Sequence, residues 1–304
     1  MKNFTEGGLM LKTSIKKLLN FAEQVMQTIF SLLKVIIFYK KTYIPPQKKR
    51  DCLVIANGIT LNDSLFKLGE NLSDFDKIVM NSIANENIYT QLKPEYYVLA
   101  DPEFFSKKSV VNIKTKTLKL KNNIVDKTTW KMTLFIPWKI IDNQKEVQAF
   151  FAKNKCISLC FFNITPVTGF EKIKFFCYKY NLGMPFLINT LVAAIYLSIN
   201  MNYKRIFLLG AENNWFNSMF VGEDNNLYIP KQYFDKTGKK ETAIVYSDER
   251  EIKKHAIWEA FYDLYILFSN YHILNRYSTY KSAKILNATP GSAIDAFERV
   301  TDIV

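Results

Sequence analysis

The sequence has few of the residues that bind metal ions, and it lacks the common nucleotide-binding motifs. Only two of its 304 residues are histidines and four are cysteines. No spacing among them suits a metal cage, so we expect no structural zinc. The GxxxxGK[ST] and GxGxxG signatures are also missing. P-loop phosphoryl transfer and dinucleotide-dependent redox chemistry therefore lose support.

Long apolar runs and targeting signals are absent as well. No uninterrupted apolar run reaches the roughly 18 to 20 residues that cross a bilayer. The first ten residues lack the apolar core and cleavage site of a signal peptide. The cysteines lie in or beside apolar runs, which indicates reduced core residues of a cytosolic protein. The pair Asp74-Phe75-Asp76 precedes its strand, so it does not form the metal-binding Asp-x-Asp of a sugar-nucleotide site.

Positive charge is what the chain has in excess. Lys and Arg number 41 against 28 Asp and Glu, a formal net charge of +13, and 48% of the residues are hydrophobic, which excludes disorder. Such a balance favours an anionic membrane surface, an acidic or phosphorylated sugar, or nucleic acid as a partner. Nothing resembles a zinc knuckle, a helix-turn-helix or an RNA-binding strand, so we expect no nucleic-acid partner.

Residues 14–40 show the period of an amphipathic helix, with apolar residues on one face and polar residues on the other. Lys16-Lys17 and Lys40-Lys41 flank it, which suits a helix lying in an anionic membrane interface. Lys34 interrupts the best candidate for a membrane span. The alternative is that the helix packs on the globular body or on a second subunit of a homo-oligomer.

Pro45-Pro46 ends this helix and divides the chain. We expect an N-terminal helix and linker over 1–47 and a globular domain over 48–304. The predicted location is cytoplasmic, peripheral on the inner face of the cell membrane.

From Asp51 onward, short apolar runs alternate with helical stretches, which predicts an α/β fold with a doubly wound, mainly parallel sheet and helices on both faces. The expected strands are 52–56, 77–80, 96–100, 133–136, 157–162, 205–209 and 283–286. The expected helices are 62–69, 83–92, 144–152, 186–201, 251–270 and a second stretch around 271–282, with a further turn and helix at 287–295. Residues 211–250 have no clear period and are predicted to form a loop or lid.

Polar residues follow several of these strands, and the carboxyl ends of parallel strands share one edge of a sheet, so their side chains would meet in one crevice. Each could equally be an ordinary turn or helix cap. The candidates for binding substrate or nucleotide here are Asn57, Gly58, Asn81, Ser82, Asp101, Gly210, Glu212, Asn213 and Asn214.

Two further features could carry chemistry. His255 begins an expected helix after the lid, where a neutral imidazole could act as a general base, although a lone histidine is more often structural. The turn with Thr289, Gly291 and Ser292 would open a helix whose N–H groups attract a phosphate, or it is a capped strand-to-helix turn.

Four segments resemble one family. Val54-Ile55-Ala56-Asn57-Gly58, Val79-Met80-Asn81, the helix from Asn189 to Asn200 and the run from Tyr203 to Glu212 are similar to the bacterial sialyltransferases of glycosyltransferase family 42 and to the related motility accessory factor proteins. The resemblance covers roughly residues 51 to 300.

The resemblance implies a GT-A-like domain that binds a CMP-activated acidic sugar and inverts the anomeric centre without a metal or other cofactor. It places Asn57 and Gly58 against the nucleotide, Asn189 and Thr190 against the donor sugar, and His255 as general base. Asn81 matches the asparagine after the second strand, and Asp101 matches a family asparagine.

The chain departs from the family in the lid. Glu212 replaces an aspartate, and the two lid tyrosines that stabilise the leaving phosphate have no match. The residues that could substitute for them are Trp215, Tyr228, Tyr233 and Tyr246.

The predicted function is therefore transfer of sialic acid, another nonulosonic acid or Kdo from a CMP-activated sugar donor to a glycan or lipid-linked glycan acceptor. Two alternatives remain. One is a non-catalytic glycan-assembly protein that retains the nucleotide-binding fold, and the other is a pyrophosphokinase-like enzyme of the same superfamily.

Overall fold

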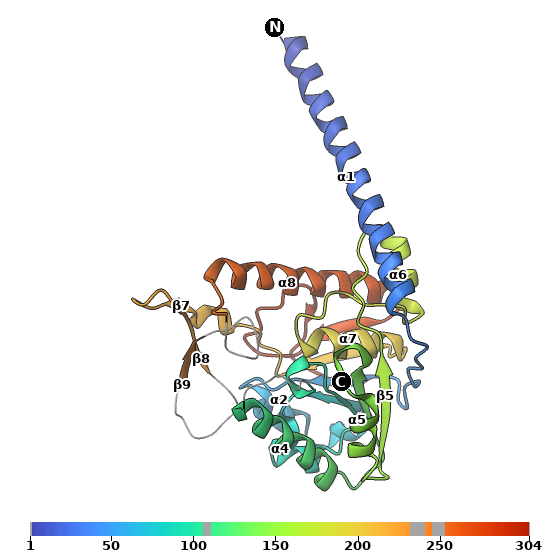
Figure 1. The fold of residues 1–304 in the computed structure, drawn as a ribbon, viewed down its shortest axis with the longest axis vertical. Helices are drawn as coiled ribbons and strands as arrows, with labels where there is room; N and C mark the ends of the chain where they lie inside the picture. The colour runs from blue at the N-terminus through green and yellow to red at the C-terminus, as the bar shows by residue number, and fades with distance from the viewer. Residues whose placement is uncertain (1, 106–110, 232–240, 245–252, 304) are drawn as a thin grey trace.

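An eight-stranded sheet forms the centre of the computed structural model, which describes residues 2–105, 111–231, 241–244 and 253–303 (Figure 1). Every neighbouring pair of strands is parallel. Across the sheet the strands are β11 (Glu298–Arg299), β10 (Lys284–Asn287), β6 (Arg205–Leu209), β1 (Cys52–Ile55), β2 (Asp76–Met80), β3 (Tyr96–Val98), β4 (Met132–Pro137) and β5 (Ile157–Phe162). The doubly wound parallel sheet is confirmed.

Helices cover both faces of this sheet, because its strands are apolar on both sides. On one face lie α2 (Leu61–Leu68), α3 (Ile88–Leu92), α4 (Val111–Lys127) and α5 (Gln144–Phe151). On the other lie α6 (Glu171–Lys179), α7 (Thr190–Asn200) and α8 (Ile257–Tyr280). The short helices η1 to η5 span Gly69–Asp74, Ile83–Asn85, Pro102–Phe104, Trp138–Ile140 and Trp215–Ser218.

Alternate residues of β1 show how the strand period builds two cores. Cys52 and Val54 pack in the core on the α7 side, whereas Leu53 and Ile55 pack in the core on the α2 side, and all four are fully buried. The lid region holds a small antiparallel sheet of β7 (Phe220–Val221), β8 (Leu227–Lys231) and β9 (Glu241–Ile244). The sequence pattern did not predict these strands.

Several expected elements differ from the observed ones. The two helical stretches predicted over 251–282 are one helix, α8, because Tyr271, Leu274 and Tyr277 continue its buried face without a break. Trp258 and Tyr265 of that helix are exposed. The sequence reading missed α4 and α6.

Residues 287–295, all of which the structure describes, contain no helix. Pro290 is followed by Gly291 with a φ of +67°, and the polar side chains of Asn287, Thr289 and Ser292 are used in hydrogen bonds within the fold. The prediction of a helix N-terminus at this turn is therefore wrong.

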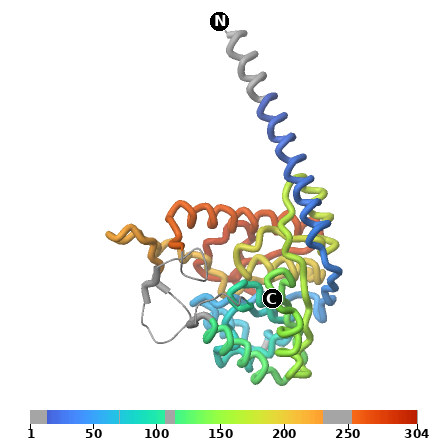
Figure 2. Tube along the Cα trace, viewed as in Figure 1, coloured from blue at the N-terminus to red at the C-terminus, as the bar shows by residue number. Residues whose placement is uncertain are grey.

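The N-terminal helix α1 (Lys2–Phe38) is longer than predicted and projects away from the body (Figure 1, Figure 2). Its contact with the body uses Thr28, Ser31 and Val35, which are buried. The Ser31 hydroxyl accepts from the N–H of Thr168 at 2.9 Å, and the Thr28 hydroxyl accepts from that of Phe170 at 3.0 Å. Two hydroxyl side chains of α1 are therefore hydrogen-bonded to the segment before α6.

The apolar side of α1 faces outward. Its exposed apolar residues include Leu18, Leu19, Ile29, Phe30, Leu33, Ile36 and Ile37. Residues Ser14–Phe38, with a mean hydropathy of 1.4, are long and apolar enough to cross a membrane by length and composition. The expectation that no segment reaches that length was too strict, because a helix with a single lysine in its most apolar part still meets the requirement.

Candidate functional site

The candidate site lies at the topological switch point of the sheet. From the adjacent strands β1 and β6 the chain continues to β2–β5 on one side and to β10 and β11 on the other, and ligands bind at such points in open α/β sheets. The turns after β1 and β6 touch, because the N–H of Gly58 donates to the carbonyl of Gly210 at 2.9 Å. Gly210 has a φ of +60°, and a Cβ there would lie 2.8 Å from the carbonyl oxygen of Ala56.

Glu212 fills the space beside Gly58. Its Oε1 accepts hydrogen bonds from the N–H of Thr60 at 2.8 Å and from the Thr60 hydroxyl at 2.5 Å. A Cβ on residue 58 would lie 1.4 Å from Glu212 Oε2. The buried carboxylate therefore caps the N-terminus of α2, which is the place where an α/β fold usually binds a phosphate. Gly58 leaves room for this side chain rather than for a ligand.

Asn57 and Ser82 meet at the ends of β1 and β2, as the sequence predicted. With its oxygen toward Ser82, the Asn57 amide accepts from the Ser82 N–H at 3.2 Å and from its hydroxyl at 2.9 Å, and it donates to the Met80 carbonyl at 3.3 Å. Asn81, which precedes Ser82, has a φ of 53°, and its carbonyl accepts from the buried Tyr97 hydroxyl. This part of the edge is a hydrogen-bonded turn with partly exposed amide and hydroxyl groups.

A second amide pair is joined by a tyrosine that the sequence analysis missed. The Tyr271 hydroxyl on α8 accepts from Asn189 Nδ2 at 3.2 Å and from Asn213 Nδ2 at 3.0 Å. Asn189 also caps α7, accepting from the N–H of Val192 at 3.0 Å, and Thr190 beside it is buried. Burial raises the pKa of Tyr271, while the two amides oppose the rise. Tyr271 has the spacing of a buried residue on an amphipathic helix, so no sequence signal distinguishes it from an ordinary core residue.

Two predicted residues of the C-terminal turn form hydrogen bonds within the fold. The buried Thr289 hydroxyl accepts from the N–H of Ala211 and donates to the carbonyl of Leu208, both at 3.1 Å. The buried Ser292 hydroxyl donates to the carbonyl of Ala211 at 2.8 Å. Gly291 is exposed. These hydroxyls hold the C-terminal segment against β6, and a role of this turn in binding a ligand stays a prediction.

Asp101 has a structural role as well. Its carboxylate caps η3, accepting from the N–H of Glu103 at 2.9 Å, and the residue is exposed. This geometry supports the reading of Asp101-Pro102 as a helix cap.

His255 lies two residues before α8, whose N-terminal end is on the lid side of the molecule (Figure 1). Its Nε2 is 3.2 Å from Asp263 Oδ2, and its Nδ1 is 3.9 Å from Glu259 Oε2. Nδ1 is buried and has no hydrogen-bond partner among the residues that the structure describes. About 21 Å of helix, at roughly 1.5 Å per residue, separates the start of α8 from Tyr271. His255 and the Tyr271 pair could therefore contact only different parts of an extended ligand.

The lid residues are only partly described. Asn214 precedes η5, and Trp215 within it is partly exposed and packs against Phe216. The Tyr228 hydroxyl donates to Asp224 at 2.8 Å, and its ring stacks on Phe220 at 5.4 Å. Tyr233 and Tyr246 lie outside the described residues.

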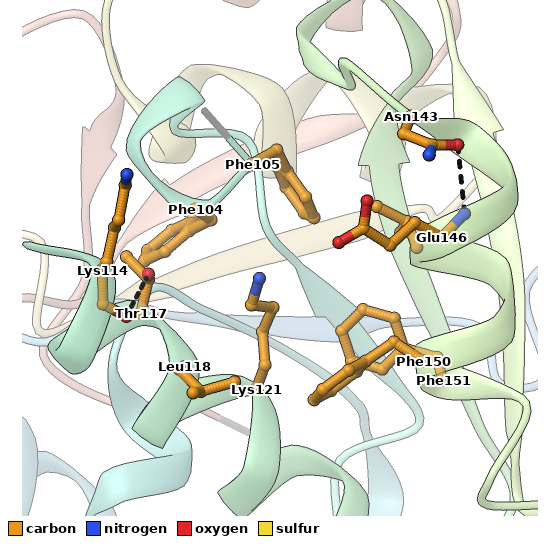
Figure 3. Close-up of a pocket in the computed structure, with 11 residues that line it drawn as sticks. Phe104, Phe105, Lys114, Thr117, Leu118, Lys121, Asn143, Glu146, Phe150 and Phe151 are labelled. Atoms are coloured by element: carbon orange, nitrogen blue, oxygen red, sulfur yellow. Dashed lines mark hydrogen bonds between the residues drawn. The ribbon is translucent and has the colours of Figure 1, made fainter. Parts of the chain in front are cut away.

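A cavity of about 470 Å³ lies between η3, α4 and α5, and the sequence analysis did not predict it (Figure 3). The Lys121 amine points into it, 5.9 Å from the Phe105 ring centre and 5.7 Å from that of Phe150. Burial lowers the pKa of Lys121, while the nearby Glu146 carboxylate opposes the change. The volume of this cavity is within the range of small-molecule sites, but the strand-end amides of the candidate site lie on other elements.

The described residues contain no group of three or more His, Cys, Asp or Glu side chains arranged to hold a metal ion.

Comparison with known proteins found similarity in fold. No protein-family model matches the sequence, and no curated protein matches it. Among solved structures, the MAf glycosyltransferase from Magnetospirillum magneticum AMB-1 is similar in fold, with a TM-score of 0.47 and 8% sequence identity. The match covers 92% of this chain and 38% of that one, so this chain spans well under half of that structure's length.

Proposed function

We propose that this protein is an inverting, metal-independent glycosyltransferase that transfers an acidic sugar from a CMP-activated donor to a surface-glycan acceptor. One observation supports this most: uncharged side chains meet in two groups at strand and helix ends, the Asn57 amide with the Ser82 hydroxyl, and the Asn189 and Asn213 amides on the Tyr271 hydroxyl. Uncharged amides and hydroxyls can bind a cytosine ring, a ribose and sugar hydroxyls. The sequence resemblance to sialyltransferases supports the donor class.

Electrostatics favour one placement of the donor. The Glu212 carboxylate at the N-terminus of α2 repels a phosphate there. We therefore place the phosphate of the donor on the lid side, away from the N-terminus of α2 and toward His255, with the nucleoside toward Asn57. The net charge of +13 attracts the anionic donor.

His255 is the proposed general base. If its Nε2–H donates to Asp263, Nδ1 is left as the proton acceptor, and the carboxylate fixes the ring orientation. The acceptor hydroxyl would lose its proton to Nδ1 as its oxygen attacks the anomeric carbon and the bond to CMP breaks. Because Nδ1 is buried here, the segment before α8 has to shift when the acceptor binds.

Donor class can be tested with a thermal-shift series using CMP, CDP, UDP and GDP, each with and without manganese. A ligand present at about 100 times its Kd stabilises the folded state by about 2.7 kcal/mol. We expect CMP alone to raise Tm and Asn57→Ala to reduce that rise. Selective stabilisation by UDP with manganese would overturn the metal-free proposal.

The base can be tested separately. His255→Ala should abolish transfer from CMP-sialic acid or CMP-Kdo and leave the CMP-induced rise in Tm intact. His272→Ala is the matched control, because the other histidine forms only an exposed ion pair with Asp295 at 3.3 Å. Equal turnover in both variants would end the assignment of His255.

A second candidate is a non-catalytic glycan-assembly protein, which the position of Glu212 favours because its carboxylate fills the usual anion site. This candidate predicts neither hydrolysis nor transfer with any CMP-sugar and no stabilisation by CMP. We propose for either candidate that the outward apolar side of α1 attaches the protein to the inner face of the cell membrane.

A further inference from the structure

Four aromatic side chains form a continuous exposed stripe on α8. Trp258, Phe261, Tyr262 and Tyr265 follow the spacing i, i+3, i+4 and i+7, which places them on one side of the helix. Each is between 57% and 69% exposed. We call these four residues the α8 aromatic stripe.

The stripe faces away from the body. The buried residues of the same helix, which include Ala260, Leu264, Leu267 and Leu274, occupy the opposite side, where α8 packs on α7 and β10. In Figure 1, α8 runs across the end of the body from which α1 projects. The exposed stripe and the exposed apolar side of α1 are thus found at the same end of the molecule.

Apolar exposure continues from α8 into the lid. Phe220 and Val221 of β7 are exposed, as is Trp215 of η5, and Phe216 of η5 packs against Phe268 of α8 at 6.0 Å. Several exposed apolar side chains on neighbouring elements indicate an interaction site.

The residue types indicate what covers this surface. Trp and Tyr combine an apolar ring with a polar group and are enriched at the headgroup level of bilayers. Lys254 is exposed at the N-terminal end of the stripe, which suits anionic headgroups. A second copy of the chain fits less well, because two molecules of net charge +13 repel each other whereas an anionic lipid surface attracts both.

We propose that the α8 aromatic stripe lies flat in the headgroup region of an anionic bilayer as a second membrane contact beside α1. Two contacts at one end of the body fix its orientation, which α1 alone, joined to it along one side, leaves free to vary. The helix that carries the stripe packs against η5 of the lid, through Phe268 and Phe216. The inference rests on the proposed attachment through α1 and not on the proposed chemistry.

Trp258 itself reports on this contact. The full chain is mixed with vesicles of phosphatidylcholine containing 30% phosphatidylglycerol, with and without lipids brominated near the headgroup, and tryptophan emission is recorded. We expect brominated lipid to quench the wild type and most of this quenching to be lost in Trp258→Phe, which keeps a ring of similar kind. Equal quenching in the two proteins would overturn the proposal.

Vesicle flotation supplies the binding measurement. Trp258→Ala with Tyr265→Ala should weaken binding to the anionic vesicles by about tenfold or more, because two partly inserted rings are removed from the interface. Phe66→Ala is the matched control, since Phe66 is an 88% exposed aromatic on α2, on the other face of the sheet. The control should bind as the wild type does.

Oligomeric state and stability are measured on the same variants. If the double variant changes the oligomeric state in analytical ultracentrifugation and binds vesicles normally, the stripe is a subunit contact and the proposal is wrong. Both variants should keep the wild-type melting curve, because the substituted side chains are exposed. The CMP-induced shift in Tm, measured on the same proteins, separates failure of this inference from failure of the proposed function.

Discussion

Replacing Gly58 with alanine tests the packing at the switch point. The added Cβ would lie 1.4 Å from Glu212 Oε2 and 2.4 Å from the carbonyl oxygen of Gly210. The first contact can be relieved only by moving a carboxylate that holds Thr60, and the second involves backbone. Overpacking of this kind costs about 1–3 kcal/mol, and loss of charge-assisted hydrogen bonds adds about 1.5–3 kcal/mol.

We therefore expect Gly58→Ala to lower the free energy of unfolding by about 3 kcal/mol. At roughly 2 °C per kcal/mol for a chain of this size, Tm falls by about 6 °C in differential scanning calorimetry. Gly291→Ala is the control for backbone strain alone, because φ there is +67° and no described atom lies within 4 Å of the added Cβ. It should cost only about 1 kcal/mol.

A double variant isolates the contact with Glu212. Glu212→Ala removes the carboxylate, so combining it with Gly58→Ala should cost less than the sum of the two single changes. The backbone contact with Gly210 keeps the rescue incomplete. The predicted clash is refuted if Gly58→Ala melts no lower than Gly291→Ala, or if the losses in unfolding free energy from the changes at 58 and 212 are simply additive.

Three further predictions follow from buried polar groups. Lys121→Met should raise Tm by about 1–2 °C at pH 7, because burial disfavours the charged amine. The lowered pKa of Lys121 means that the unfolded chain binds more protons than the folded one, so the stability of the wild type should rise toward pH 10. Urea titrations at several pH values should show this rise for the wild type and not for the variant. Thr289→Val should lower the urea midpoint by the equivalent of about 1–3 kcal/mol with an unchanged m value, because it leaves the N–H of Ala211 without its acceptor. A change below about 0.5 kcal/mol, the size typical of neutral surface substitutions, would contradict this. Tyr271→Phe should destabilise the fold by about 1–2 kcal/mol and reduce the CMP-induced shift in Tm, because the Asn189 and Asn213 amides lose their common acceptor; an undiminished shift would place the donor elsewhere.

Much of the fold was predictable because its signals are local. Strand β6 was expected over the residues it occupies, since a continuous apolar run such as Ile206–Leu209 suits a strand buried on both faces. Helix α4 was missed because its lysine-rich sequence has a weak apolar stripe. The helix expected over 287–295 failed because tertiary hydrogen bonds of Thr289 and Ser292 outweigh a local tendency to start a helix.

The sequence by itself determined the alternation of strands and helices and the polar turns at the ends of β1, β2 and β6, because apolar period and turn chemistry are properties of neighbouring residues. Only the tertiary structure decided which polar groups remain available. It used the hydroxyls of Thr289 and Ser292 inside the fold, placed Glu212 beside Gly58, and left the apolar side of α1 and the α8 aromatic stripe exposed. A side chain's partner often lies far away along the chain, so its availability depends on packing that no local pattern records.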